Sequence, residues 1–104
     1  MSEQLFTAVT KAGDIAEKSF STFEVNGTDI VICRLRDEYF AIENQCSHAL
    51  SAFNAGRMRG YQITCPLHGA TFDIRDGSAT SLPAKLPIRS FPLRIVDGMI
   101  EVKL

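Results

Sequence analysis

The sequence has only three cysteines, two histidines and no strong excess of charge. Three cysteines cannot all pair within one chain, and a reducing cytosol would oppose disulfides in any case. The net charge of −1 supplies no positive field for nucleic acid or anionic lipid, so we expect neither partner. The sequence contains no long apolar run and no charged-then-apolar start, which predicts neither a membrane span nor a signal peptide. A cytoplasmic location is therefore the default expectation.

The sequence also lacks any helical period longer than about two turns. Its 104 residues are enough for one domain, and a content of 45% hydrophobic and 22% charged residues is typical of a globular protein. Short apolar stretches separated by frequent turn residues predict an all-β domain, built as a small sandwich or barrel of antiparallel sheets.

Turn residues divide the chain into its expected strands. Asn26-Gly27 and Asp97-Gly98 predict tight hairpins, and residues 11–18 support at most one helical turn. Cys33 lies in an apolar run and is interpreted as a buried residue, not as a reactive thiol or a ligand. The expected strands are 5–9, 20–25, 28–35, 39–42, 61–64, 70–74, 89–96 and 99–104.

The remaining cysteines and both histidines form two short pairs. Cys46 and His48 are separated by one residue, sixteen residues follow, and Cys65 and His68 are separated by two. Two thiolates and two imidazoles would bind a metal centre, and a structural zinc site is one alternative. Zinc sites of this composition usually pair cysteine with cysteine. The mixed pairs instead favour a two-iron cluster, in which one iron takes both thiolates and the other both imidazoles.

This ligand pattern, with Pro66 and Gly69 beside the second pair, resembles the Rieske 2Fe–2S motif. Phe72-Asp73, Gly77 and Pro83 match the family further along the chain, Pro83 in the loop that covers the cluster. By its size the chain is most similar to the Rieske ferredoxins of bacterial aromatic-ring-hydroxylating dioxygenases. The resemblance implies a single Rieske domain, with a base of small antiparallel sheets (about 1–43 and 77–104) and an inserted two-loop cluster-binding part (about 44–76). It also implies one 2Fe–2S cluster, with Cys46, His48, Cys65 and His68 as its ligands.

Four positions differ from the respiratory members of the family. Ser51 and Leu67 stand where those proteins carry an additional disulfide, and Ala70 and Phe72 stand where they place hydroxyl groups near the cluster sulfurs. Fewer hydrogen bonds to sulfur stabilise the reduced cluster less. We therefore expect a reduction potential toward the low end of the roughly −150 to +300 mV Rieske range.

The histidine count also bears on function. The cluster would use both histidines, so the chain could not build a mononuclear iron site of the two-His, one-carboxylate type. The sequence has no glycine-rich dinucleotide fingerprint either. These observations predict an electron carrier and not an enzyme. The resemblance implies that it passes single electrons from a flavin- and nicotinamide-dependent ferredoxin reductase to a terminal Rieske non-haem iron oxygenase, both transient partners.

Two alternatives remain at this stage. One is a Rieske-like small subunit of a larger reductase such as nitrite reductase, and the other is the structural zinc domain. The residues expected to contact these redox partners are Gln45, Phe53, Met58, Pro66 and Leu67, with Arg57 and Arg59 as steering charges. For Phe53 and Met58 the alternative to docking is local packing under the loop. For Arg57 and Arg59 the alternative is a plain solvated turn.

Overall fold

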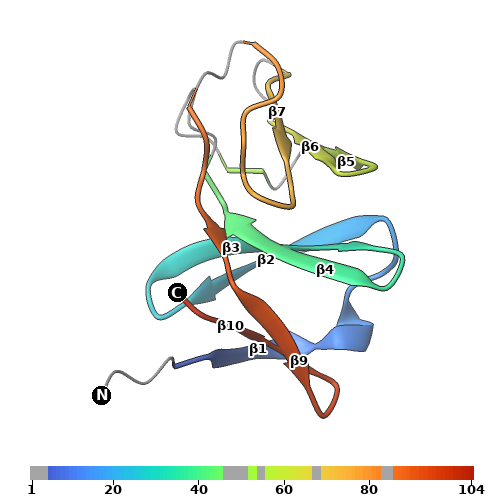
Figure 1. The fold of residues 1–104 in the computed structure, drawn as a ribbon, viewed down its shortest axis with the longest axis vertical. Coiled ribbons are helices and arrows are strands. Elements are labelled where there is room, and N and C mark those ends of the chain that lie inside the picture. The colour runs from blue at the N-terminus through green and yellow to red at the C-terminus, as the bar shows by residue number, and fades with distance from the viewer. Residues whose placement is uncertain (1–4, 46–51, 54–55, 67–68, 83–85) are drawn as a thin grey trace.

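Three antiparallel sheets are stacked along the long axis of the protein (Figure 1). The computed structural model describes residues 5–45, 52–53, 56–66, 69–82 and 86–104. Within these ranges the chain forms ten strands and one short 3-10 helix, η1 (Ala12–Asp14). The predicted all-β class is confirmed.

Each sheet draws on a different part of the chain. In spatial order, sheet A contains β1 (Thr7–Lys11), β10 (Met99–Val102) and β9 (Leu93–Val96). Sheet B contains β2 (Ser19–Val25), β3 (Thr28–Leu35), β4 (Glu38–Glu43) and β8 (Ser90–Phe91). Sheet C contains β5 (Arg57–Arg59), β6 (Gln62–Thr64) and β7 (Thr71–Asp73). Sheet C thus comes from the chain between β4 and β8.

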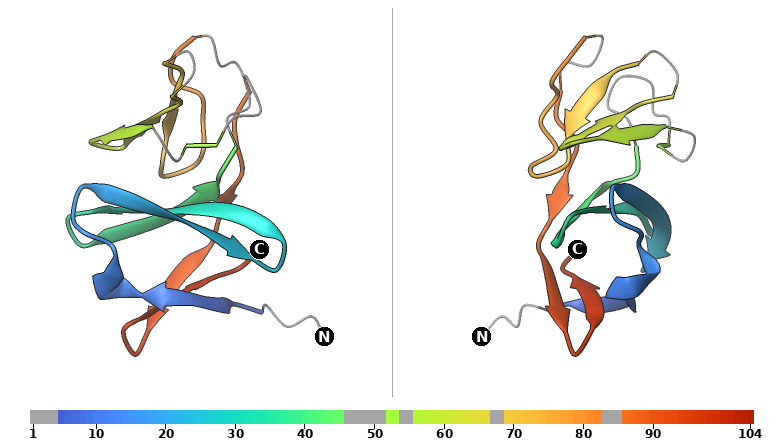
Figure 2. Two further views of the ribbon diagram at one scale, coloured as in Figure 1. Left: turned by 180° about the vertical axis from the view of Figure 1, so that it is seen from behind. Right: turned by 90° about the vertical axis from the view of Figure 1, so that its right-hand side faces the viewer.

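Sheet B lies in the middle of the stack and is buried on both faces (Figure 2). Successive side chains of a strand point to opposite faces, so the apolar run of β3 supplies two cores. Ile30 and Ile32 pack against sheet A in what we call the base core. Val31 and Cys33 pack under sheet C in what we call the upper core. This double burial explains why β3 is apolar at consecutive positions.

The two predicted hairpins are present. Asn26 and Gly27 have φ values of 51° and 82°, and Asp97 and Gly98 have φ values of 51° and 77°. Two consecutive positive φ angles are the requirement of the tight turn that joins twisted antiparallel strands. These turns fix the pairing of β2 with β3 and of β9 with β10.

The strand predicted over 89–96 is wrong as one element. Pro92 divides it into β8, which pairs with β4 in sheet B, and β9, which pairs with β10 in sheet A. Proline has no N–H to donate to a ladder, which favours a change of sheet at this residue. Strand β5 was not predicted, and β1 covers 7–11 instead of 5–9.

The two strands of the last hairpin are buried to different extents. Ile100 and Val102 of β10 are fully buried in the base core. Ile95 and Val96 of β9 are 43% and 41% exposed, whereas Leu93 is partly buried and packs against the base core. Among the described residues, no helix is long and apolar enough to cross a membrane.

Candidate metal centre

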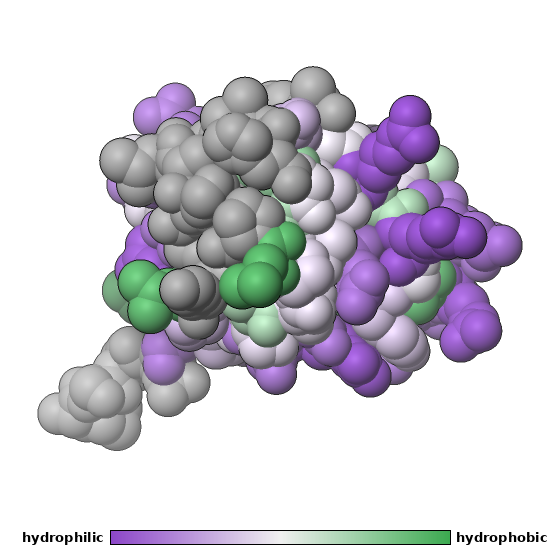
Figure 3. All heavy atoms as spheres, turned by 90° about the horizontal axis from the view of Figure 1, so that it is seen from above, coloured by the Kyte–Doolittle hydropathy of each residue, from purple (hydrophilic) through white to green (hydrophobic). Residues whose placement is uncertain are grey.

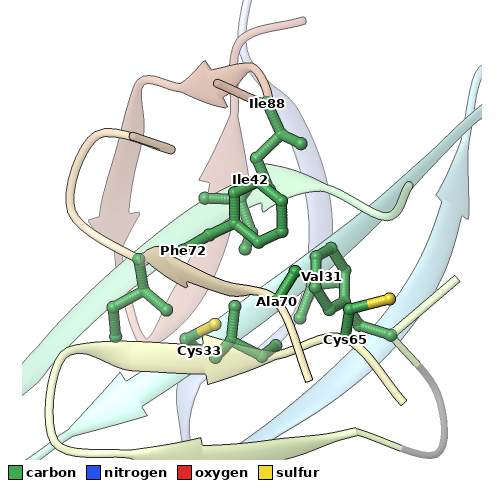
Figure 4. Close-up of a cluster of buried hydrophobic side chains, with 10 residues drawn as sticks. Val31, Cys33, Ile42, Cys65, Ala70, Phe72 and Ile88 are labelled. Carbon is green, nitrogen blue, oxygen red and sulfur yellow. The ribbon is translucent and has the colours of Figure 1, made fainter. Parts of the chain in front are cut away.

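Cys65 is the one predicted ligand that lies among the described residues. Cys46, His48 and His68 lie outside them, as do Ser51, Leu67 and Pro83, so the four-ligand assignment stays a prediction. Cys65 directly follows β6 and is 1% exposed. Figure 4 shows its sulfur at the edge of the upper core, directed away from Cys33. A buried thiol at the end of a strand is a suitable ligand for a soft metal centre.

Backbone hydrogen bonds join the two ends of residues 65–70, which we call the second ligand segment. The Cys65 N–H donates to the Ala70 carbonyl at 2.7 Å, and the Gly69 N–H donates to the Cys65 carbonyl at 3.2 Å. These bonds continue the β6–β7 ladder, in which Thr64 pairs with Thr71. The ends of the second ligand segment are therefore held together by sheet C.

Asn44 joins the two ends of residues 44–53, which we call the first ligand segment, and sequence reasoning missed this role. The Phe53 N–H donates to Asn44 Oδ1 at 2.8 Å, while the Asn44 N–H donates to the Asp29 carbonyl at 3.0 Å. This side-chain bond joins residues 44 and 53, between which the predicted ligands Cys46 and His48 lie. The only signal in the sequence was a polar residue directly after strand β4, two positions before a candidate ligand.

Phe53 is buried, so its predicted role as a docking contact is wrong. Its side chain has no exposed surface, and its ring packs edge-to-face on Phe72 with centroids 5.6 Å apart. Such pairs stabilise an apolar core beyond the area they bury. Met58 is half-buried and packs against the upper core, which is the local packing considered for it.

The other docking candidates are accessible to different extents. Pro66, Arg57 and Arg59 are exposed, and Gln45 is half-buried. Leu67 lies outside the described residues. A docking role for these residues stays a prediction.

Cys33 is a core residue, as predicted. Its side chain is fully buried in the upper core, and desolvation raises the pKa of its thiol to about 12. A thiol with so high a pKa stays neutral at ordinary pH and is a poor metal ligand.

Ala70 and Phe72, the two positions used to predict a low potential, are both fully buried in the upper core. Neither side chain carries a hydrogen-bond donor. The apolar surroundings of Cys65 therefore fit the predicted low potential, which itself stays a prediction.

A polar network outside the predicted site links sheets B and C. The Tyr61 hydroxyl donates to Glu38 Oε1 at 2.5 Å, and the Arg75 guanidinium lies 4.1 Å from the centroid of the Tyr61 ring. Arg75 also forms a two-pronged ion pair with Asp73 at 2.8 and 3.0 Å. The hydrogen bond to Glu38 raises the pKa of Tyr61, and the hydrogen bond from Arg75 lowers the pKa of Asp73. Sequence reasoning did not find this network, because Glu38, Tyr61 and Arg75 are far apart in the chain.

Comparison with known proteins identifies the family. Residues 6–92 match the model of the Rieske [2Fe-2S] domain. The chain belongs to this family. This Rieske protein is 35% identical over 98 residues to the ferredoxin component of biphenyl 2,3-dioxygenase from Rhodococcus jostii (strain RHA1), covering 94% of the chain and 92% of the relative.

Solved structures agree with this assignment. The ferredoxin of carbazole 1,9a-dioxygenase from Nocardioides aromaticivorans IC177 has a TM-score of 0.91 at 31% identity, covering 94% of this chain and 96% of that one. A ferredoxin solved in complex with the oxygenase of a carbazole 1,9a-dioxygenase has a TM-score of 0.89 at 25% identity, covering 97% and 94%. The prediction of a Rieske ferredoxin that carries electrons and is not itself an enzyme is confirmed. Its cofactor is a Rieske-type 2Fe–2S cluster, which replaces the zinc alternative.

Proposed function

We propose that this Rieske ferredoxin passes single electrons from a flavin- and nicotinamide-dependent reductase to a terminal oxygenase that hydroxylates an aromatic compound. The observation that carries the proposal is the solved complex of oxygenase and ferredoxin in a carbazole 1,9a-dioxygenase, whose ferredoxin shares this fold along nearly its whole length. The relative from the biphenyl system, similar over 94% of the chain, supports the same role. Both partners bind in turn and transiently, as is usual for redox complexes with small interfaces.

We assign the cluster to Cys46, His48, Cys65 and His68. When bound, the cluster supplies one-electron redox chemistry, in which its iron atoms take up and release the electron. The described residues fit this assignment, because the buried Cys65 thiol lies at the edge of an apolar core. The hydrogen bond from the Cys65 N–H to the Ala70 carbonyl fixes the backbone of Cys65 at the end of β6.

The apolar residues of the upper core that surround Cys65 also bear on the reduction potential. Phe53, Phe72 and Ile63 are fully buried in the same core as Cys65. A cluster bound at Cys65 would adjoin this apolar core, which would exclude water, disfavour additional charge on the cluster and so favour a low potential. We place the protein in the cytoplasm, where a reducing environment keeps thiol ligands unpaired.

The first test is chemical analysis of the purified protein. We expect about two irons and two acid-labile sulfides per chain and a visible spectrum that bleaches on reduction. Replacing His48 or His68 by alanine should abolish the normal spectrum, whereas Cys33→Ala should leave it intact. Stoichiometric zinc in a colourless, folded protein would contradict the ligand assignment.

The second test is electron transfer. The reduced protein is mixed without oxygen with the terminal oxygenases of the biphenyl and carbazole systems, and its reoxidation is followed by stopped-flow absorbance. Reoxidation that saturates with oxygenase concentration supports the proposed function. If neither oxygenase reoxidises the ferredoxin although its cluster is intact, the proposed function is refuted.

A further inference from the structure

Gly56 is joined to the end of the first ligand segment by a backbone hydrogen bond. Its N–H donates to the Phe53 carbonyl at 2.7 Å. Phe53 is in turn held by Asn44, whose Oδ1 accepts the Phe53 N–H at 2.8 Å. Two consecutive hydrogen bonds therefore connect Gly56 to both ends of the first ligand segment.

Gly56 also lies directly against the backbone that carries Cys65. A methyl group added at Gly56 would overlap the Thr64 carbonyl oxygen and would lie 3.3 Å from the Thr64 carbonyl carbon and 3.1 Å from the Phe53 carbonyl oxygen. Thr64 immediately precedes Cys65, and the residue after Gly56, Arg57, pairs with Thr64 in the β5–β6 ladder. Only a residue without a side chain fits this approach. Gly56 is thus a point at which the two ligand segments meet through their backbones.

The backbone of Thr64 has little freedom to give way. Thr64 pairs with Arg57 of β5 on one side and with Thr71 of β7 on the other. The part of Thr64 that meets Gly56 is its carbonyl group, so rotation of a side chain cannot relieve an overlap. A displacement of this carbonyl is passed to Cys65, because the two residues share a planar peptide bond.

Side chains on the outer side of sheet C contribute little to this contact. Arg57, Arg59 and Gln62 of β5 and β6 are exposed. Figure 3 looks down on sheet C and shows polar side chains over the end of the molecule at which β5 and β6 join. The fit at Gly56 therefore depends on the backbone and not on apolar packing over it.

We propose that Gly56 is a positioning residue for the metal centre, because its lack of a side chain sets the spacing between the first ligand segment and Cys65. The inference rests on the ligand assignment of the proposed function and concerns a residue outside that assignment. A side chain at Gly56 must displace the backbone of Thr64 or that of Phe53, and either movement changes how the ligand segments face each other. Residues that orient metal ligands without binding the metal typically change metal affinity ten- to a hundredfold.

The test compares Gly56→Ala with Gly77→Ala as a matched control. At both glycines an added methyl group overlaps a backbone carbonyl oxygen to the same extent, and both N–H groups donate to a backbone carbonyl at 2.7 Å. Gly77 meets Ile88, which does not adjoin a predicted ligand in the chain. Gly13→Ala is the second control, because nothing lies within 4 Å of its added methyl group.

Three properties of each cluster-loaded protein are measured. They are the reduction potential, the g values of the reduced protein by electron paramagnetic resonance, and the free energy of unfolding by guanidinium. The g values and the potential respond to the surroundings of the iron, whereas a loss of stability alone leaves them unchanged.

We expect Gly56→Ala to change the g values and to raise the potential. Opening the close approach admits water beside Cys65, which stabilises the additional charge of the reduced centre. A tenfold change in the relative stability of the two redox states, which we expect as a minimum, corresponds to a shift of about 59 mV. Gly77→Ala should lose at least as much stability, because Gly77 also has a positive φ, but should keep the g values and potential of the unaltered protein. Gly13→Ala should change neither.

The contrary outcomes are distinct. If Gly56→Ala keeps the unaltered g values and potential, or if Gly77→Ala changes them equally, the inference is overturned and the proposed function stays intact. If Gly56→Ala yields too little folded protein, the comparison is repeated in the Gly13→Ala background, which should be slightly more stable because alanine restricts the unfolded chain. If Gly56→Ala does not fold there either while Gly77→Ala does, Gly56 supports the fold as a whole and the inference is overturned. If the unaltered protein lacks the cluster spectrum, the ligand assignment fails and the inference fails with it.

Discussion

Gly77→Ala should destabilise the protein far more than the same change at another glycine of similar backbone conformation. Gly77 has a φ of +81°, and a methyl group there would overlap the Ile88 carbonyl oxygen and lie 3.0 Å from the Ile88 carbonyl carbon. The left-handed conformation alone costs an alanine about 1–2 kcal/mol. Relieving the overlap must shift the backbone that carries the Ile88-to-Gly77 hydrogen bond, which should cost about another 2 kcal/mol. We expect a total loss of about 3–4 kcal/mol.

Gly98→Ala separates the two contributions. Gly98 has a φ of +77° but nothing within 4 Å of the added methyl group, so it should lose only the conformational part. Unfolding of each cluster-loaded protein by guanidinium, followed without oxygen by far-ultraviolet circular dichroism, gives the difference in midpoint and in free energy. Equal losses for Gly77→Ala and Gly98→Ala would refute the reasoning from close approach.

Three further predictions concern Ala70, Asn44 and Cys33. Ala70→Ser should raise the reduction potential by about 40–90 mV, because a hydroxyl donated to sulfur stabilises the reduced centre by about 1–2 kcal/mol; a potential that stays constant or falls, in a variant with an unchanged visible spectrum, would count against this. Asn44→Ala should bleach faster on heating than the unaltered protein, because it leaves the buried Phe53 N–H without its acceptor at a cost of about 1–3 kcal/mol. Asn44→Asp keeps an acceptor and should bleach more slowly than Asn44→Ala; equal rates would show that the bond does not hold the segment. Stability should fall as the pH rises above the ordinary thiol pKa of 9.0 toward the folded value of about 12, because the unfolded state releases the Cys33 proton first. Cys33→Ala should show a smaller fall in denaturant titrations between about pH 8 and 11, and an identical pH dependence would exclude Cys33 as its source.

The sequence predicted correctly those structural features that depend on residues close together in the chain. The Asn26-Gly27 and Asp97-Gly98 turns depend on two adjacent residues, and the run of β3 depends on eight consecutive ones. The ligand spacing is equally local, and it led to the family before any fold was known. Sequence reasoning also placed Cys33 correctly, because a cysteine within an apolar strand has few alternatives.

Long-range interactions account for what the sequence could not predict. Pro92 divides one apolar stretch between two sheets, which depends on how β4 and β10 approach it. The sequence left docking and local packing open for Phe53, because its partner Phe72 is far away in the chain, on a strand of sheet C. Leu82 and Leu86 are 72% and 67% exposed, and the sequence alone did not distinguish them from core leucines.

Because strand β3 belongs to both cores, the visible absorbance of the cluster should report on the folding of the whole protein. Ile30 and Ile32 belong to one core, while Val31 and Cys33 belong to the other, so neither core can come apart without disturbing the strand that also supports the other. Melting of the base should therefore release the iron in the same cooperative step. A simple absorbance trace would then rank any library of substitutions in sheet A or sheet B by stability, including substitutions far from Cys65.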